Sequence, residues 1–172
     1  MSPRATARLE SFGLREVYDY AAGKSDWFAF GLPMEGEGAR VPRAGQFARH
    51  DVPTCHPEER LGAVRERAAA ASWDAGVVVN HDRVVLGLLD RSRLAGDPDR
   101  TAEEVMELGP STFRPDAPIE RLLDYMRRHR RSGVLVTTPD GRLVGLVRRD
   151  QRLNRTLEEA ETYIWFGDHR GG

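Results

Sequence analysis

The chain has 172 residues, of which 40% are hydrophobic and 31% are charged, a composition typical of a folded domain with its own core. Its formal net charge is −1, so the whole-chain charge gives no reason to expect binding to nucleic acid or to an anionic membrane. No apolar run approaches the roughly 18 residues of a membrane span. The single cysteine, Cys55, excludes an intrachain disulfide. We therefore expect a cytoplasmic protein with no membrane partner.

The first 48 residues differ from the rest of the chain. Residues 1–9 are polar, lack the apolar stretch of a signal peptide and are expected to be disordered. Within the extension 10–48, a short helix is predicted near Ser25–Phe30, with Ser25 as its N-cap and Gly31 as its terminator. Gly36–Gly45 is rich in glycine and charge and is predicted to be a linker.

Two later segments repeat one pattern. Pro57 and Leu61 align with Pro115 and Ile119 at a spacing of 58 residues, and Thr54 aligns with Thr112. The apolar run that begins at Gly76 aligns with the run that begins at Gly133, at a spacing of 57. Self-similarity at a nearly fixed spacing predicts two copies of one supersecondary unit that share a core.

Each copy contains a short extended piece, an amphipathic helix and two apolar strands joined by a turn. The apolar stripe of the helix recurs at i, i+3 and i+7 in both copies. The stripe residues are Leu61, Val64 and Ala68 in the first copy and Ile119, Leu122 and Met126 in the second. The strands after the helices, Val77–Val79 and Val134–Val136, are apolar throughout and are predicted to be buried on both faces. Turns follow at Asn80–Arg83 and Pro139–Gly141.

Two further helices are predicted from their caps. Thr101–Glu104 has the spacing of a capping box, and the helix that it begins is short because Gly109-Pro110 stops it. Thr156–Glu159 repeats the capping pattern near the C-terminus. We therefore expect a C-terminal helix and tail over residues 156–172, with an apolar cluster at Ile164–Phe166 that packs against another apolar surface.

The duplicated unit resembles a tandem cystathionine β-synthase (CBS) domain pair, also called a Bateman module. The resemblance rests on Arg131–Asp150 in the second copy and on Ala75–Val79 and Val84–Asp90 in the first, and it covers about residues 49–152. It implies an α+β fold of two pseudo-symmetric β-α-β-β-α units, 49–100 and 101–155. It also implies a homodimer and a regulatory module that binds an adenosine-containing ligand (AMP, ADP, ATP or S-adenosylmethionine) between the units, for a regulated protein that the sequence does not identify.

The same resemblance indicates where a ligand would bind. The family motif Gly-apolar-apolar-Thr/Ser-x-x-Asp departs at Gly87–Arg93, where Asp90 takes the hydroxyl position, and at Gly145–Gln151, where Asp150 falls one residue early. The second copy is the better candidate because its arginines offer guanidinium groups to phosphate. Its predicted ligand-binding residues are Thr112, Arg131, Ser132, Gly133, Val134, Arg148, Arg149 and Asp150. A second, weaker cleft would use Thr54, Gly76, Val77, Asp90 and Arg93, with Asp90 opposing phosphate.

Other functions have less support. The same fold without a ligand would serve as a dimerisation or docking module, through Trp165 and Phe166 and the aromatic residues of Trp27–Phe30. Val17–Gly36 resembles the C-terminal end of a rhodanese domain, which implies a remnant or a docking segment. A sulfurtransferase is the third interpretation, disfavoured because no nucleophile loop accompanies that segment.

The remaining reactive side chains do not form a catalytic or metal-binding pattern. Cys55-His-Pro-Glu-Glu-Arg60 has four residues between Cys and Arg, one fewer than a phosphatase-type loop, and two of them are carboxylates that oppose an anionic substrate. Cys55 aligns with Phe113, which favours a packing role. The five histidines lack the spacing of a metal site. We expect neither catalytic residues nor a required cofactor.

Overall fold

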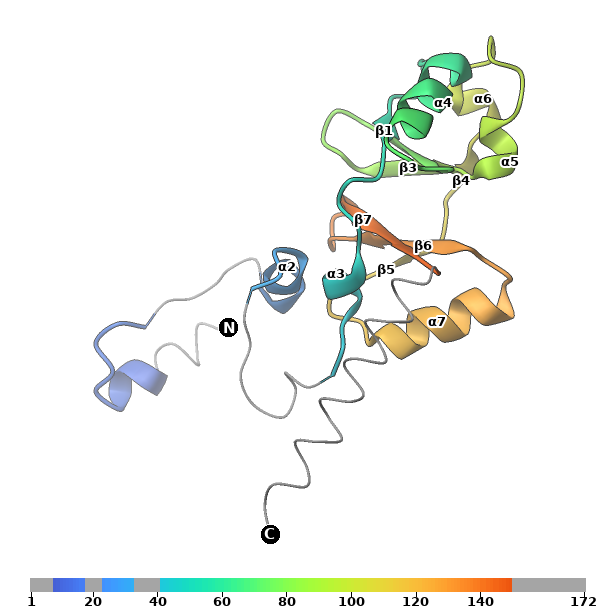
Figure 1. The fold of residues 1–172 in the computed structure, drawn as a ribbon. Helices are drawn as coiled ribbons and strands as arrows, with labels where there is room; N and C mark the ends of the chain where they lie inside the picture. Colours follow the sequence, from blue (N-terminus) through green and yellow to red (C-terminus); the bar gives the residue numbers. More distant parts are fainter. Residues whose placement is uncertain (1–7, 18–22, 33–40, 150–172) are drawn as a thin grey trace.

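The computed structural model describes residues 8–17, 23–32 and 41–149, and the fold is that of these residues. They form two similar units, each with a small sheet whose outer side is covered by helices (Figure 1). The two sheets face each other across the middle of the molecule (Figure 1). The mixture of helices and mixed sheets confirms the predicted α+β class.

The first unit contains a four-stranded sheet in the order β1-β2-β3-β4. Its elements in chain order are β1 (Thr54–Cys55), α4 (Leu61–Ala70), β2 (Gly76–Val79), β3 (Val85–Leu89), α5 (Arg91–Leu94), α6 (Ala102–Val105) and β4 (Glu107–Leu108). Strands β1 and β2 are parallel, so the chain between them must cross over the sheet, and α4 makes that crossover. The β2–β3 and β3–β4 pairs are antiparallel.

The second unit repeats this arrangement with a three-stranded sheet, β5-β6-β7. Its elements are β5 (Thr112–Phe113), α7 (Ile119–Arg128), β6 (Gly133–Thr137) and β7 (Leu143–Arg148). Here too the pair joined by the helix, β5–β6, is parallel, and β6–β7 is antiparallel. A short helix from before the first unit, α3 (Ala44–Phe47), packs against β7 and α7.

The strand registers show that a single spacing of 58 residues relates the two units. Thr54 pairs with Val77, and Thr112 pairs with Leu135, so Val77 corresponds to Leu135. The spacing of 57 predicted for the strands after the helices is therefore wrong: Gly76 corresponds to Val134, and Gly133 corresponds to Ala75. The irregularities after Val78 and after Val136 fall at the same point of the repeat, so no residue is inserted between the units.

The segment that leads into each unit packs on the other unit: α3 leads into the first unit, and α6 with β4 leads into the second. The Arg43 amide donates to the Gln46 side chain at 2.9 Å, as the Thr101 amide donates to Glu104 at 2.8 Å, so α3 and α6 begin alike. Yet α3 lies against the second unit, whereas α6 and β4 lie against the first (Figure 1). Backbone bridges fix this exchange, because Arg49 pairs with Leu146 just as Glu107 pairs with Leu88.

The two units meet on a pseudo-two-fold axis. Val84 pairs with Arg142 in an antiparallel bridge between the two hairpins, and these two positions are themselves equivalent in the repeat. The cores are joined as well: Leu135, Leu143 and Leu146 of the second unit belong to the buried cluster built around α4 and β2. The two units therefore share one core and are not separate domains joined by a linker.

The predicted helix faces and turns are found in the structure. All six stripe residues of α4 and α7 are at most 2% exposed. The Thr101–Glu104 capping box begins α6 as predicted. Asn80 organises the first turn by accepting from the Asp82 and Val84 amides at 3.0 and 2.9 Å. In the second turn, Gly141 has φ +82°, a left-handed conformation that favours glycine.

The N-terminal extension packs through α2 (Gly23–Ala29) against α3, which in turn lies against the second unit. Gly31, with φ +63°, ends this helix as predicted, but the helix begins at Gly23, so Ser25 lies inside it and is not its N-cap. The predicted linker also contains structure, because Ala44 and Gly45 of α3 are buried beneath α2 and α7. The resemblance of this segment to a rhodanese terminus stays a prediction. The proposals for residues 1–7 and 150–172, which include the C-terminal helix, lie outside the described residues.

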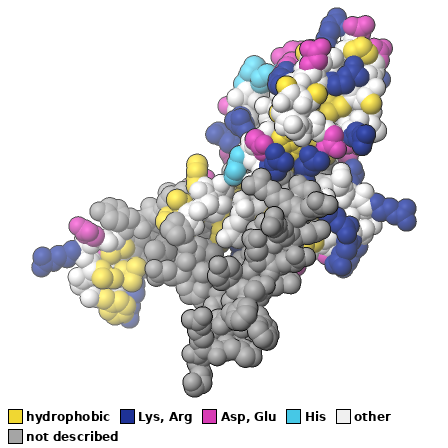
Figure 2. Space-filling view, viewed as in Figure 1, with side chains coloured by type: hydrophobic (Ala, Val, Ile, Leu, Met, Phe, Trp, Pro, Cys, Tyr) yellow, Lys and Arg dark blue, Asp and Glu magenta, His cyan; other side chains and the backbone are white. Residues whose placement is uncertain are grey.

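Charges of both signs are mixed over the visible surface. In Figure 2, basic and acidic side chains alternate around the first unit, and no large patch of one sign appears among the coloured residues. This mixture agrees with a net charge of −1. Within the part of the chain that the structure describes, none of the helices has the length and apolar character needed to cross a membrane.

Candidate functional site

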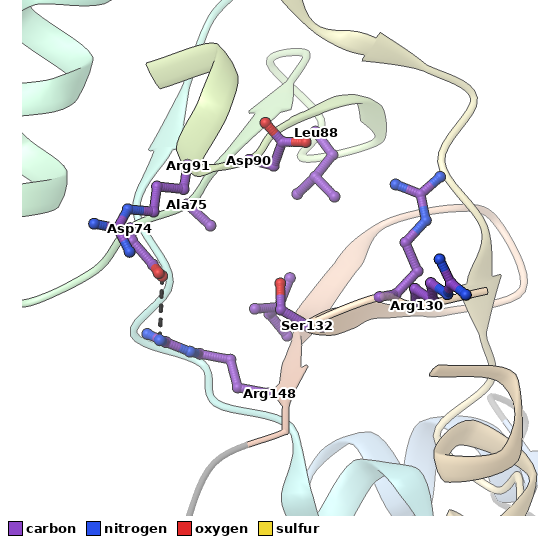
Figure 3. Close-up of a pocket in the computed structure, with 11 residues that line it drawn as sticks. Asp74, Ala75, Leu88, Asp90, Arg91, Arg130, Ser132 and Arg148 are labelled. Atoms are coloured by element: carbon purple, nitrogen blue, oxygen red, sulfur yellow. Dashed lines mark ion pairs between the residues drawn. The ribbon is translucent and has the colours of Figure 1, made fainter. Parts of the chain in front are cut away.

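A cleft of about 150 Å³ opens between the two sheets, close to the pseudo-two-fold axis, and we call it the axial cleft. Its lining comes from the start of β2 and the end of β3 in one unit, and from the start of β6 and the end of β7 in the other (Figure 3). The lining residues are Asp74, Ala75, Leu88, Asp90, Arg91, Arg130, Arg131, Ser132, Gly133, Leu146 and Arg148.

The lining consists largely of equivalent residues from the two units. Ala75 and Gly133 are one equivalent pair, and Leu88 and Leu146 are another, so small and aliphatic groups face the cleft from both sides. The charges break the symmetry, because the positions of Asp74 and Asp90 in the first unit correspond to those of Ser132 and Arg148 in the second. The acidic groups of the cleft therefore come from the first unit and most of the guanidinium groups from the second.

A smaller pocket of about 20 Å³ adjoins the axial cleft and shares Leu88, Arg131 and Gly133 with it. Its other lining residues are Glu107, Pro110, Ser111, Tyr125, Val134 and Leu135. Tyr125 is held in place by its hydroxyl, 2.6 Å from Ser111 Oγ, and by an edge-to-face contact with Phe113. Apart from the Arg131 and Glu107 side chains and the hydroxyl groups of Ser111 and Tyr125, the lining of this pocket is apolar or formed by backbone.

Arg131 joins the two spaces and is held by a carboxylate. Its two terminal nitrogens donate to Glu107 at 2.8 and 2.6 Å, a bidentate pair. This hydrogen bonding raises the pKa of Arg131 further above its ordinary value. Glu107 also lies 3.9 Å from Arg93, which in turn lies 2.7 Å from Asp90. A chain of alternating charges thus runs from α5 of the first unit to β6 of the second.

Arg148 points toward the first unit. Its guanidinium group lies 3.1 Å from the Asp74 carboxylate, the ion pair marked in Figure 3, and 5.2 Å from the ring centroid of Trp73. Arg130 stands on the opposite side of the cleft, with Ser132 between the two arginines (Figure 3). Among the described residues, no ion pair is found for Arg130 or Arg91. These two exposed guanidinium groups are the ones most open to an anion.

The structure brings together four of the eight residues predicted for the second-copy site. Arg131, Ser132, Gly133 and Arg148 line the axial cleft, and Val134 lines the smaller pocket with Arg131 and Gly133. Thr112 and Arg149 are exposed and belong to the lining of neither space, although the Arg149 amide donates to the Ser132 carbonyl at 2.9 Å. Asp150 lies outside the described residues. The role of all these residues in ligand binding stays a prediction.

The weaker predicted cleft does not gather around one opening. Asp90 lines the axial cleft, but Arg93, which pairs with it, does not. Gly76 and Val77 are buried in β2, and the Thr54 carbonyl accepts from Arg67 at 2.8 Å. Burial opposes the charge of Asp90, but hydrogen bonds from Ser92 and Arg93 outweigh it and lower the pKa of this carboxyl. Asp90 is therefore a structural cap of α5 as well as a wall of the cleft.

Several residues that line the two spaces were not predicted from the sequence. Arg130, Glu107, Tyr125 and Asp74 all face one of the two spaces but belong to no motif. A uniform spacing of 58 would have aligned Trp73 with Arg131 and shown that the two units differ at this position. Nothing in the sequence indicates that Glu107, on an edge strand, reaches Arg131.

The other reactive side chains have structural surroundings. Cys55 is 1% exposed, and burial together with the nearby charge of Glu59 raises its pKa to about 12. A thiol in that state is a poor nucleophile at neutral pH, which favours the packing role. The rings of His56 and His81 lie 4.9 Å apart, and His56 Nδ1 contacts the Val79 carbonyl. Within residues 8–17, 23–32 and 41–149, no three metal-ligating side chains are clustered.

Comparison with known proteins agrees with this geometry. Residues 102–154 match the family model of the CBS domain. Among solved structures, the CBS domain pair of protein MJ0100, in complex with 5′-methylthioadenosine and S-adenosyl-L-methionine, has a TM-score of 0.62 at 18% identity, over 69% of this chain and 98% of that one. The described fold is that of a CBS domain pair.

Two further solved structures are similar to this CBS pair. The CBS domains of a transcriptional regulator from Streptococcus pneumoniae have a TM-score of 0.61 at 16% identity, over 66% of this chain and 98% of that one. The cytosolic domain of the Mg²⁺ channel MgtE, in complex with ATP, has a TM-score of 0.61 at 22% identity, over 69% of this chain. The match spans about half of the MgtE chain, 51%.

Proposed function

We propose that this chain is a non-catalytic regulatory module that binds an adenosine-containing ligand between its two CBS units and passes the bound state to a partner protein. The observation that carries the proposal is the axial cleft, where guanidinium groups meet beside an apolar pocket. The candidate ligands are AMP, ADP, ATP and S-adenosylmethionine. The complexes of MgtE with ATP and of MJ0100 with adenosine derivatives support this ligand class.

The two spaces suit the two ends of such a ligand. The smaller pocket, with Tyr125, Pro110 and Val134, offers the apolar contacts that a planar base needs. The axial cleft offers Arg130 and Arg131 to phosphate or carboxylate oxygens. At about 20 Å³ the smaller pocket is too small for a base, so binding must move the side chains around it.

The Arg131–Glu107 pair is the side-chain contact that we expect to open. It lies between the two spaces, and the Arg131 side chain is 41% exposed. A partly exposed ion pair of this kind contributes about 1 kcal/mol or less, so an anionic ligand can take the place of Glu107 at little cost. The displaced carboxylate sits on β4, which leads directly out of α6. Movement of this strand is our proposed route from ligand to partner.

The experiment combines thermal unfolding and calorimetric titration with AMP, ADP, ATP and S-adenosylmethionine. A ligand at about 100 times its dissociation constant should stabilise the fold by roughly 2.7 kcal/mol and raise the melting temperature by several degrees. Arg131→Gln should weaken binding about tenfold or more, because hydrogen bonds to charged groups contribute about 1.5–3 kcal/mol. Glu107→Gln should tighten binding, because it removes the competing carboxylate and keeps the side-chain shape.

The matched control is Arg121→Gln, an exposed residue of α7 that lines neither space. It should leave affinity unchanged. If Arg121→Gln and Arg131→Gln weakened binding equally, the effect would be one of net charge, and the site would be misplaced. If none of the four ligands shifted the melting temperature, the sensor function would be excluded for this ligand class.

A second candidate is a ligand-free dimerisation or docking module with the same fold. The observation that favours it is that Arg131 and Arg148 already have carboxylate partners, Glu107 and Asp74. Leu108, beside Glu107 on the edge strand β4, is 74% exposed and offers an apolar contact. This function predicts a concentration-dependent homodimer, measured by sedimentation, that Leu108→Asp weakens and that adenosine ligands do not affect.

A further inference from the structure

The first unit has an indole ring at the place where the second unit has Arg131. Trp73 precedes Arg131 by 58 positions, and Arg49 precedes Glu107 by the same spacing. In the second unit these two places hold the Arg131–Glu107 ion pair beside the smaller pocket. In the first unit they hold Trp73 and Arg49, with the guanidinium group 4.3 Å from the ring centroid. An ion pair at one site is thus replaced by a cation–π contact at the other.

The protein surrounds this indole on several sides. Arg49 lies over its ring, and Arg148, from the other unit, also lies over the ring, at 5.2 Å. The indole N–H donates to Asp51 at 3.4 Å, and Trp73 is only 4% exposed. Both arginines are held in place by carboxylates, Arg49 by Asp51 and Arg148 by Asp74. A planar heterocycle with a ring N–H is thus held by two cations and an acceptor.

We infer that Trp73 permanently occupies the ligand place of the first unit, so that the module binds one ligand rather than two. The emptied place would take a planar aromatic heterocycle, because guanidinium groups attract the face of any such ring. The ligand count rests on the proposed function, whereas the occupancy of this place by the indole does not. Arg148 then serves the first unit, by covering Trp73, rather than a phosphate bound to the second.

The test replaces Trp73 by Ala and measures two quantities. Calorimetric titration with the adenosine ligand of highest affinity should give one site per chain in the wild type and two in Trp73→Ala. Independently, free indole should raise the melting temperature of Trp73→Ala by several degrees and leave the wild type unchanged. Adding Arg49→Met to Trp73→Ala should reduce the indole effect, because it removes a cation and keeps the aliphatic length.

The possible outcomes separate the occupancy of the first-unit place by Trp73 from the binding of an adenosine ligand. Two sites in the wild type, or a Trp73→Ala variant that indole does not stabilise, would overturn the inference. If the wild type bound no adenosine ligand but indole still rescued Trp73→Ala, the proposed function would fail and the occupancy by Trp73 would stand. Where Trp73→Ala does not fold, Trp73→Leu keeps part of the apolar packing and is tested with indole in the same way.

Discussion

Single side chains decide how the two equivalent sites differ. The Arg131–Glu107 pair is partly exposed, so water screens it and its net contribution to stability is small. Trp73, in contrast, is almost fully buried, and removing its ring would cost about 3–5 kcal/mol. We therefore propose that a ligand can displace the contact at the second site but not the indole at the first. In our proposal, the differences at these equivalent positions make a nearly symmetric fold asymmetric in ligand binding.

Cys55 makes the stability of the fold depend on pH above neutrality. Burial raises the pKa of its thiol to about 12, well above the ordinary value of 9.0. Between these values the unfolded chain loses the thiol proton while the folded chain keeps it, so the free energy of unfolding falls as pH rises. The expected slope is about 1.4 kcal/mol per pH unit. Below about pH 9 the contribution is fully present.

Cys55→Ala provides the control for this prediction, because it keeps every other group that titrates at high pH. Denaturant unfolding of both proteins between about pH 8 and about pH 11 should show the wild type losing its advantage over Cys55→Ala. A constant difference between the two curves would mean that the thiol is accessible in the folded state. Thiol-specific reagents should then label the native protein, which we do not expect.

Part of the candidate site could be predicted from the sequence. Arg131, Ser132 and Gly133 were found because they precede an apolar strand in a repeated pattern, and strand ends lie at the edges of a sheet. Glu107 was missed because its contact with Arg131 spans 24 positions and two units. Ion-pair partners at that separation leave no periodicity in the sequence, so the pairing of Arg131 with Glu107 could not be predicted.

Among the elements, the leading segments of the two units depend on a pair of equivalent glycines. A Cβ atom on Gly145 would lie 2.5 Å from the Arg49 carbonyl oxygen, which is backbone. A Cβ atom on Gly87 would lie 2.4 Å from the Met106 sulfur and 2.8 Å from Met106 Cβ, so another rotamer would relieve most but not all of the overlap. Each glycine lets an incoming segment lie directly on the sheet. The obstacle is backbone at Gly145 and mainly a flexible side chain at Gly87.

Gly145→Ala should therefore destabilise the fold more than Gly87→Ala. Overpacking against backbone costs about 1–3 kcal/mol or more, whereas another rotamer of Met106 moves its sulfur and Cγ aside and leaves only its Cβ too close. Urea unfolding of the two variants measures the difference directly, and each variant controls for the other because the positions are equivalent. Equal losses would indicate that Met106 is as firmly held as the Arg49 backbone.

The elements found from sequence were those with a strong local pattern. Helices α4 and α7 have three stripe residues each, and α6 has a capping box, so their positions follow from local rules. The first two residues of α3, Ala44 and Gly45, fall in the predicted linker because that segment is rich in glycine. Its burial comes from contacts with α7 and β7, far along the chain, and Gly45 is required because a Cβ atom there would lie 2.6 Å from the Phe28 carbonyl oxygen.

Over the whole molecule, the exchanged segments and the shared core predict a single cooperative unit. Arg49 pairs with Leu146 across the units, and Leu143 of β7 is buried in the cluster built around the first unit's helix. Loss of packing in one unit should therefore lower the free energy of unfolding of both units. Two independent domains joined by a linker would instead unfold separately. The contrast between these behaviours can be measured with one pair of leucine variants.

Leu143→Ala should lower the free energy of unfolding of the entire module by about 2–5 kcal/mol, the usual cost of a buried leucine. Leu143 is 7% exposed and lines neither ligand space, so ligand effects do not interfere. Leu108→Ala is the control, because Leu108 is 74% exposed and the destabilisation should stay within about 0.5 kcal/mol.

Amide hydrogen exchange then reports on each sheet separately. Leu143→Ala should accelerate exchange in β2 of the first unit as much as in β6 of the second, since both are protected by the same global opening. Faster exchange in β6 alone would show that the second unit opens by itself and that the module has no single core.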